Sequence, residues 1–282
     1  MSAPLAGLRF CLAGPGKVGS SLAGWAVAAG AELVAVAGRG ALAELASGGL
    51  DLLLLALPDA ALAAAAAELA RRPQAAVALH TSGSLDASVL APLRAAGSAV
   101  GSLHPLKAFP EPLPDPAEAR GVFFAVDGDP TARELAARLA TAWEGVAGEV
   151  PPAARPLYHF AATLAAGGVV TLLSVAGELG ERLGLPSAVT RGYLELARGA
   201  VAAAGQGLDA GRPLAAAITG PVARGDAAAL RRQLAALRVS AADKLPLARA
   251  LAAETAHQRQ GLGEELSALL STLKTEPEEP RN

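Results

Sequence analysis

A glycine-rich segment near the start of the chain constrains the fold more than any other feature of the sequence. It stands between an apolar run, residues 8–13, and an amphipathic run, residues 18–29. In a Gly-x-Gly-x-x-Gly turn, the glycines permit a tight turn, the approach of a pyrophosphate, and close packing of the next helix on the strand. The free N–H groups at the amino terminus of that helix also attract phosphate. The segment therefore predicts a dinucleotide site that consists of Gly14, Pro15, Gly16, Lys17, Val18 and Gly19.

Apolar runs alternate with helical patterns through the first half of the chain. Continuous apolar strands joined by helices are typical of a parallel sheet covered on both faces, and right-handed crossovers make such a sheet doubly wound. We therefore expect an α/β fold that begins with a Rossmann domain built on a doubly wound parallel sheet. The expected strands are residues 8–13, 32–37, 51–57, 75–79, 99–103 and 122–126, and the expected helices are residues 18–29, 41–46, 59–71, 85–96 and 131–146.

The strand pattern stops at two consecutive prolines, Pro151 and Pro152, and helical periodicity continues beyond them. The proline-rich residues 109–116 predict a long loop, because proline lacks an N–H donor and fixes φ. We expect a dinucleotide-binding Rossmann domain over 1–150, an all-α C-terminal domain for substrate and dimerisation over 151–274, and a disordered tail over 275–282. The expected helices of the second domain are residues 154–183, 186–205, 214–218, 226–237, 240–259 and 262–273.

Composition limits the classes of partner. The 282 residues include 24 Lys and Arg against 26 Asp and Glu, a net charge of −2, so we expect neither a nucleic-acid nor a membrane partner. The one cysteine, Cys11, fits a reducing cytosol, and the first residues lack the basic segment of a signal peptide. We expect a cytoplasmic protein. The chain has no His-x-x-x-His pair, no cysteine pair and no dense carboxylate cluster, so we expect no metal site.

An uncharged stretch covers residues 160–177. A helix that is apolar all round either spans a membrane or is deeply buried. Polar and small residues such as Thr163, Gly167 and Ser174 interrupt the stretch, which favours burial. We predict that it lies at the core of the helical domain and contributes to a homodimer.

The end of the second expected strand indicates which nucleotide binds. Folds selective for NAD place an acidic residue there to bind the ribose 2′-hydroxyl, whereas this chain has Gly38 and Arg39. A guanidinium at this place pairs with a 2′-phosphate, so we predict NADP(H) rather than NAD(H). After the third strand, Pro58 and Asp59 place a turn and a helix cap beside the cofactor.

Three of the four histidines fall at strand ends or at the domain junction: His80, His104 and His159. Ligands of doubly wound sheets lie at the carboxyl ends of the strands, so His80 and His104 point toward one crevice. For each histidine alone, a supporting hydrogen bond and direct contact with substrate or proton both remain open. We predict cofactor contacts from His80, Thr81, Ser82 and Gly83.

Hydride transfer needs a nicotinamide held near a carbonyl or imine, a donor for the developing anion, and a cation for any substrate carboxylate. We predict that His104 or His159 donates the proton. Lys107 or Arg155 is expected to hold a carboxylate of the small-molecule substrate.

Five segments spread along the chain form a recognisable set. They read Gly-Pro-Gly-Lys-Val-Gly from Gly14, His-Thr-Ser-Gly from His80, Gly-Ser-Leu-His-Pro-Leu from Gly101, Leu-Tyr-His from Leu157, and Thr-Gly-Pro-Val-Ala-Arg-Gly-Asp from Thr219. The set resembles a bacterial family with a Rossmann-like domain followed by a helical domain of unknown function. That family belongs with NADP oxidoreductases of the coenzyme F420-dependent type, pyrroline-5-carboxylate reductase and 6-phosphogluconate dehydrogenase-like proteins.

Some members of that family look like an alternative ketopantoate reductase, which implies reduction of 2-dehydropantoate with NADPH. The resemblance also implies that Arg224 contacts substrate or phosphate and that Asp226 caps the next helix. The chain departs from the pattern at Arg155, where relatives often carry lysine, and at Gly167, where they often carry asparagine. Two alternatives therefore stay open: a reductase of an imine or a β-hydroxyacid-type substrate, and a non-catalytic NADP(H)-binding sensor or scaffold.

Overall fold

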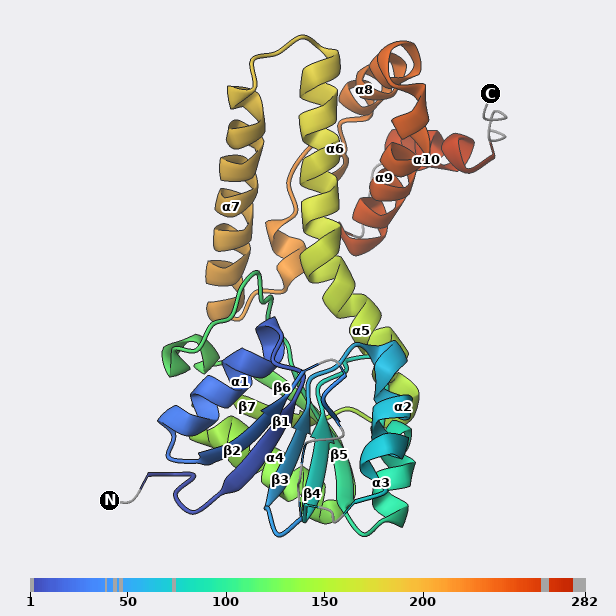
Figure 1. Ribbon diagram of the computed structural model, residues 1–282. Helices are drawn as coiled ribbons and strands as arrows, with labels where there is room; N and C mark the ends of the chain where they lie inside the picture. The colour runs from blue at the N-terminus through green and yellow to red at the C-terminus, as the bar shows by residue number, and fades with distance from the viewer. Residues whose placement is uncertain are drawn as a thin grey trace. The chain divides into compact units, whose positions relative to one another are not determined.

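The computed structural model describes residues 3–38, 40–42, 45, 48–72, 75–259 and 264–275. The chain divides into two compact units, Met1–Gly167 and Gly168–Asn282 (Figure 1). The sequence predicted a boundary at residue 150, and the observed division lies later in the chain. The helix that follows the two prolines belongs to the first unit because Arg155 holds it there, through contacts described below.

The first unit is built on a seven-stranded, mostly parallel sheet with the order β2-β1-β3-β4-β5-β6-β7. All six expected strands are confirmed, and β7 is additional. The strands are β1 (Arg9–Ala13), β2 (Glu32–Ala37), β3 (Leu52–Leu55), β4 (Val77–His80), β5 (Ala99–Pro105), β6 (Phe123–Gly128) and β7 (Val146–Glu149).

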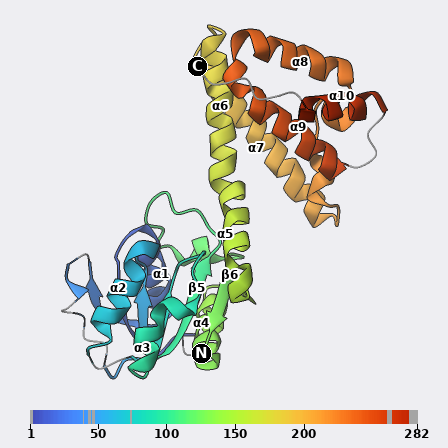
Figure 2. The ribbon, with the colours of Figure 1, turned by 90° about the vertical axis from the view of Figure 1, so that its right-hand side faces the viewer.

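Helices cover both faces of this sheet. One apolar cluster packs α1 and α4 against one face around Trp25 and Trp143, and another packs α2 and α3 against the opposite face; α2 and α3 lie side by side (Figure 2). The helices are α1 (Lys17–Ala28), α2 (Asp59–Leu69), α3 (Ala91–Ala95), α4 (Pro130–Ala142) and α5 (Arg155–Thr163), with 3-10 turns η2 (Ala87–Leu90), η3 (Pro116–Ala119) and η4 (Pro152–Ala154).

The sheet departs from the expected all-parallel arrangement at one pair, because β5 and β6 run antiparallel. A parallel connection needs a crossover of a dozen or more residues, usually a helix. The segment between these strands is rich in proline and contains only the short turn η3. The chain therefore turns back and adds β6 in the opposite direction.

The expected helix over 131–146 was also too long, since α4 ends at Ala142. Glu144 has a φ of 56°, a left-handed conformation that interrupts a helix. A Cβ at Gly145 would lie 2.5 Å from the Phe124 ring. The turn at these two residues ends α4 and starts β7.

The second unit is all-α in its described residues, as expected. Its helices are α6 (Val169–Arg182), α7 (Ala188–Asp209), α8 (Ala227–Ser240), α9 (Leu245–Arg259) and α10 (Glu264–Thr275), with 3-10 turns η6 (Leu214–Ala217), η7 (Val222–Arg224) and η8 (Ala242–Lys244). The Asp226 carboxylate accepts a hydrogen bond from the Ala229 N–H at 2.8 Å, which confirms its predicted cap of α8. Residues 276–282, most of the predicted disordered tail, lie outside the described residues.

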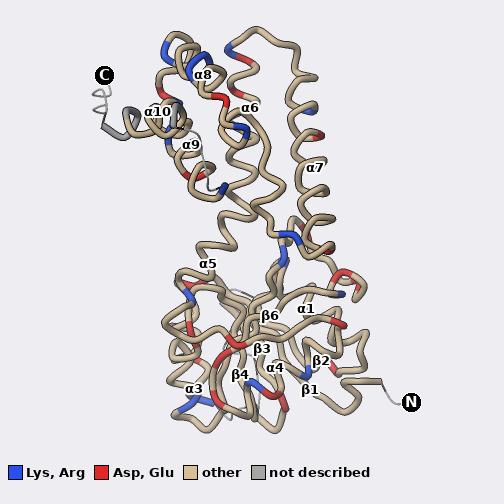
Figure 3. The backbone as a smooth tube through the Cα atoms, turned by 180° about the vertical axis from the view of Figure 1, so that it is seen from behind, with Lys and Arg blue, Asp and Glu red and all other residues tan. Residues whose placement is uncertain are grey.

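The uncharged stretch does not lie in a core, and that prediction was wrong for a single copy of the chain. Exposed fractions are 57% for Phe160, 55% for Leu164 and 66% for Val170. Figure 3 shows α5 and the first turns of α6 almost free of charged residues. Pro152–Arg182, with a mean hydropathy of 1.8, is the one described helix long and apolar enough to cross a membrane, a test that core helices of soluble proteins also pass.

Candidate functional site

A cavity of about 500 Å³ lies within the first unit, where β1, β3, β4 and β5 end. The same edge carries the ligand in doubly wound sheets. Its lining combines the start of α1, the segments at the ends of β3, β4 and β5, and His159 of α5. The lining residues are Gly16, Lys17, Val18, Ala56, Leu57, Pro58, Asp59, Thr81, Ser82, Gly83, His104, Pro105, Lys107, Phe109 and His159.

The three glycines of the first turn occupy the places that their predicted roles require. Gly14 has a φ of 95°, and a Cβ there would strike the Ala56 carbonyl oxygen. A Cβ on Gly19 would strike the carbonyl oxygen of Gly14, so helix and strand approach closely. A Cβ on Gly16 would meet nothing within 4 Å. Gly16 is also the N-cap of α1 without a side-chain capping bond, so the helix start opens on the cavity.

His80 holds the loop after β4 without lining the cavity. The Ser82 N–H donates to its Nδ1 at 3.2 Å, and its Nε2 lies 3.1 Å from the Asp86 carbonyl oxygen, so both ring nitrogens of this buried side chain are occupied. Burial, followed by the charge of Arg155, lowers the pKa of His80 to about 4. His80 is therefore neutral at pH 7 and holds the loop that carries Thr81, Ser82 and Gly83, rather than lining the cavity itself.

Arg155 is fully buried, at 0% exposed. Its guanidinium donates to the carbonyl oxygens of Ser82 at 3.1 Å and Leu85 at 3.2 Å, and to the Ser102 hydroxyl. Its Nε lies 3.0 Å from an Asp127 carboxylate oxygen. These contacts join α5, β5, β6 and the loop after β4. The predicted binding of a substrate carboxylate does not fit this placement, because the guanidinium is occupied and absent from the cavity lining.

His104, Tyr158 and His159 form a cluster beside Gly83. The Tyr158 hydroxyl lies 2.9 Å from His104 Nδ1, and the two imidazole rings are 5.9 Å apart between centroids, nearly perpendicular. A Cβ on Gly83 would lie 2.5 Å from His159 Nδ1 and 2.7 Å from His104 Nε2. The glycine thus lets both imidazoles approach the loop backbone at the cavity wall.

Burial and the neighbouring positive groups keep His104 uncharged. Burial, followed by the nearby His159 and Arg155, lowers the pKa of His104 to about 4. Lys107, the predicted alternative for holding a carboxylate, lines the cavity and pairs with Glu118 at 2.8 Å. The cavity therefore presents a neutral imidazole next to two lysines, Lys17 and Lys107.

The structure brings most of the predicted site residues together. Among those predicted, the lining includes Gly16, Lys17, Val18, Pro58, Asp59, Thr81, Ser82, Gly83, His104, Lys107 and His159. Gly14, Pro15 and Gly19 shape the turn, and Gly38 lies outside the lining. Arg39 falls outside the described residues. Within the described part of the chain, no group of three His, Cys, Asp or Glu side chains is placed to hold a metal ion.

Tyr158 and Phe109 were missed as site residues. The signal for Tyr158 lay in the spacing of Arg155, Tyr158 and His159, since residues at i, i+3 and i+4 share one face of a helix. Phe109 had no such signal, because it stands in the proline-rich loop. It reaches the site by packing on Trp25, with ring centroids 5.9 Å apart.

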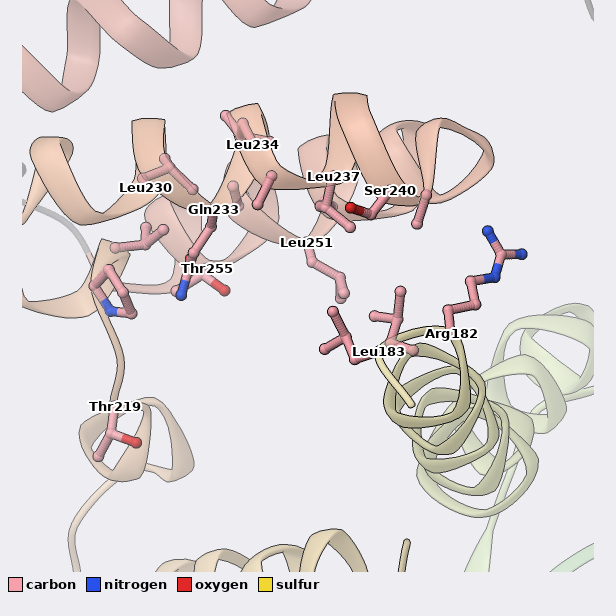
Figure 4. A pocket seen from close by; sticks show the side chains of 17 residues that line it. Arg182, Leu183, Thr219, Leu230, Gln233, Leu234, Leu237, Ser240, Leu251 and Thr255 are labelled. Atoms are coloured by element: carbon pink, nitrogen blue, oxygen red, sulfur yellow. The ribbon is translucent and has the colours of Figure 1, made fainter. Parts of the chain in front are cut away.

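A second cavity, of about 530 Å³, lies within the second unit between α6, α8 and α9. Leu183, Leu237 and Leu251 face one another across it (Figure 4). Arg182 is the one titratable side chain of its lining, and it pairs with Asp243 at 2.6 Å. The groups suited to proton transfer therefore belong to the first cavity.

Comparison with known proteins bears on the fold. Residues 122–255 match a family model described as a domain of unknown function, DUF2520. No curated protein matches the chain. Among solved structures, a candidate NADP oxidoreductase from Bacteroides fragilis is 18% identical with a TM-score of 0.71, over 90% of this chain and 99% of that one.

Two further structures resemble this one. A protein from Thermotoga maritima is 18% identical with a TM-score of 0.69, over 89% of this chain and 98% of that one. The pyrroline carboxylate reductase of Plasmodium falciparum, solved with NADP bound, is 14% identical with a TM-score of 0.56, over 90% and 99%. The chain thus shares with these proteins a fold in which a Rossmann-type unit precedes a helical unit, and its residues 122–255 match the DUF2520 model.

Proposed function

We propose that this chain is an NADP(H)-dependent oxidoreductase that reduces a small carbonyl or imine compound. The observation that carries the proposal is the cavity itself. It begins at the open amino terminus of α1 beside Gly16 and ends at two imidazoles, His104 and His159. One end suits a pyrophosphate, and the other suits proton donation to a reduced substrate. The fold shared with an NADP-bound reductase supports the same conclusion.

The residues present fit the cofactor. The open space at Gly16 and the first N–H groups of α1 would hold the pyrophosphate, with Lys17 adding positive charge. Thr81, Ser82 and Gly83 would hold the nicotinamide ribose. When bound, NADPH supplies a hydride. The protein then has to orient the substrate, exclude water and give a proton to the atom next to the reduced carbon.

The choice of NADP(H) over NAD(H) rests on Arg39, which we propose as the contact to the 2′-phosphate. The substrate proposed first is a small keto acid, with 2-dehydropantoate the compound that the family resemblance names. An imine is the alternative, supported by the fold shared with a pyrroline carboxylate reductase. Lys107, at the cavity wall, is the described cation better placed than Arg155 to meet a substrate carboxylate.

Loss of nicotinamide absorbance with a panel of keto acids and cyclic imines tests this function. Turnover of one class identifies the substrate. Tight binding of NADPH without turnover of any compound in the panel supports the remaining alternative, a non-catalytic sensor or scaffold.

We also propose a homodimer formed through the helical unit. Apolar side chains stand exposed on α6 and α7, among them Val170 at 66%, Leu196 at 72% and Val201 at 63%. Burial of such a face against a second copy removes apolar surface from water. Light scattering at micromolar concentration tests this, and a strictly monomeric species contradicts it. We propose a cytoplasmic location because a chain with a single cysteine, Cys11, fits a reducing compartment.

A further inference from the structure

The hydrogen bond between Tyr158 and His104 bears on where the proton of the proposed reduction comes from. His104 lines the cavity, whereas Tyr158 does not. The Tyr158 hydroxyl lies 2.9 Å from the inward nitrogen, Nδ1, and the rings are perpendicular with centroids 5.6 Å apart. Nε2 is the nitrogen beside Gly83 at the cavity wall. The imidazole therefore stands between the cavity and a phenol.

A neutral imidazole needs a second proton source in order to act as an acid. With its pKa lowered to about 4, about one His104 in a thousand is an imidazolium at pH 7, so the abundant form carries a single ring proton. When that form gives up the proton on Nε2, it becomes an imidazolate unless Nδ1 takes up a proton in the same step. The group in contact with Nδ1 is a phenol, which has a proton to give.

We infer that the Tyr158 hydroxyl supplies, through the imidazole of His104, the proton that the reduction requires, an inference that rests on the proposed function. The hydride adds to the substrate carbon and breaks the π bond, and the substrate oxygen or nitrogen takes the proton from Nε2. Nδ1 takes the phenolic proton in turn. The imidazole ends neutral as its other tautomer. The starting state returns when Nδ1 gives its proton back to the phenolate and Nε2 takes a proton from water in the cavity. Tyr158 is a positioning and proton-supplying residue, and His104 is the residue that touches substrate.

The positive charge of Arg155 favours loss of the Tyr158 proton. Burial raises the pKa of Tyr158, and the positive charge of Arg155 opposes that rise. Tyr158 and Arg155 lie on the same face of α5, three residues apart. The buried guanidinium that the sequence suggested as a substrate anchor therefore also stabilises the phenolate that the transfer leaves behind.

The test compares Tyr158→Phe with Tyr193→Phe, which removes the other tyrosine hydroxyl of the chain from α7 in the second unit. In Tyr158→Phe we expect an unchanged NADPH dissociation constant and a kcat lower by about 100-fold, at the lower end of the range for general acid catalysis. The alkaline limb of the pH profile of kcat, which reports loss of the phenolic proton, should disappear. Tyr193→Phe should match the wild type. An unchanged kcat and pH profile in Tyr158→Phe overturns the inference.

A second measurement does not depend on turnover. Nitrogen NMR of labelled histidine, assigned by the signals that vanish in His104→Gln, reports which ring nitrogen of His104 carries the proton. We expect a proton on Nε2 and none on Nδ1 at pH 7, and a mixture of tautomers in Tyr158→Phe. A proton on Nδ1 in the wild type overturns the inference, because His104 then donates to the tyrosine. If NADPH binds and no substrate is reduced, the proposed function fails, while the tautomer still supports or overturns the placement of the proton.

Discussion

Replacing Arg155 with methionine separates a structural role of this residue from a role in binding substrate. The change removes the partner of the buried Asp127 carboxylate, 3.0 Å away, and the donor to the carbonyl oxygens of Ser82 and Leu85. Breaking a buried pair by removing one partner costs about 3–5 kcal/mol, because it leaves an uncompensated charge. For a unit of this size, that loss lowers the melting temperature by about 10 °C.

Intrinsic fluorescence is a selective assay for this effect. Both tryptophans of the chain, Trp25 and Trp143, are buried in the first unit, so their emission follows the unfolding of that unit alone. Arg120→Met is the matched control, since Arg120 and Glu144 form an ion pair with both side chains 67% exposed, and exposed pairs contribute little. Its melting temperature should stay near that of the wild type.

The opposite pattern refutes this reasoning. If Arg155→Met has the melting temperature of the wild type but a higher KM for a carboxylate substrate, Arg155 binds that carboxylate. The sequence-based expectation would then be right, and the buried placement of the guanidinium would not describe the working protein.

Three further predictions test other parts of the site. Gly83→Ala introduces a Cβ 2.5 Å from His159 Nδ1, and we expect kcat to fall by about tenfold or more with a small change in melting temperature; unchanged kinetics would show that the imidazoles need not approach the loop. Arg39→Asp should weaken NADPH relative to NADH, measured as the ratio of their dissociation constants, and a constant ratio excludes Arg39 as the 2′-phosphate contact. The pKa of His80 falls to about 4 on folding, so the unfolded chain binds more protons than the folded chain between about pH 6.5 and 4. Denaturant titrations should show that the free energy of unfolding is highest above this window and decreases as pH falls through it, by about 3 kcal/mol at most from His80. The free energy of unfolding of His80→Gln should depend less on pH.

The glycine turn, six strands and the crevice at the carboxyl ends of β1, β3, β4 and β5 were predictable, because each depends on local pattern. An apolar run of strand length indicates that the strand is buried. The spacing of Gly14, Gly16 and Gly19 indicates the contacts that one turn must make. The direction of β6 was not predictable from its own residues. It depends on the connection over 106–122, which is long enough for a parallel crossover but is rich in proline and forms no crossover helix.

The roles of charged and aromatic residues were harder to predict than their positions. Arg155 was expected to bind a substrate carboxylate. Its partners Asp127, Ser82 and Ser102 come from distant parts of the chain, and no local sequence pattern predicts that they meet. The uncharged stretch over 160–177 was expected in a core, whereas most of its residues are exposed in one copy of the chain. Hydropathy records that a surface is apolar and does not record what covers it.

The binding of NADPH at the start of α1 tests the central claim most directly, and Gly16→Val is the variant for it. Gly16 has an ordinary extended conformation with a φ of −77°, and a Cβ there meets nothing within 4 Å. The valine should therefore fold normally and fill the space meant for the pyrophosphate. Energy transfer from the tryptophans to added NADPH measures both proteins. We predict clear binding by the wild type and a loss of at least about tenfold in affinity, about 1.4 kcal/mol, in Gly16→Val at an unchanged melting temperature. Equal affinity in the two proteins, or no binding by the wild type, would contradict the assignment of this cavity to a dinucleotide.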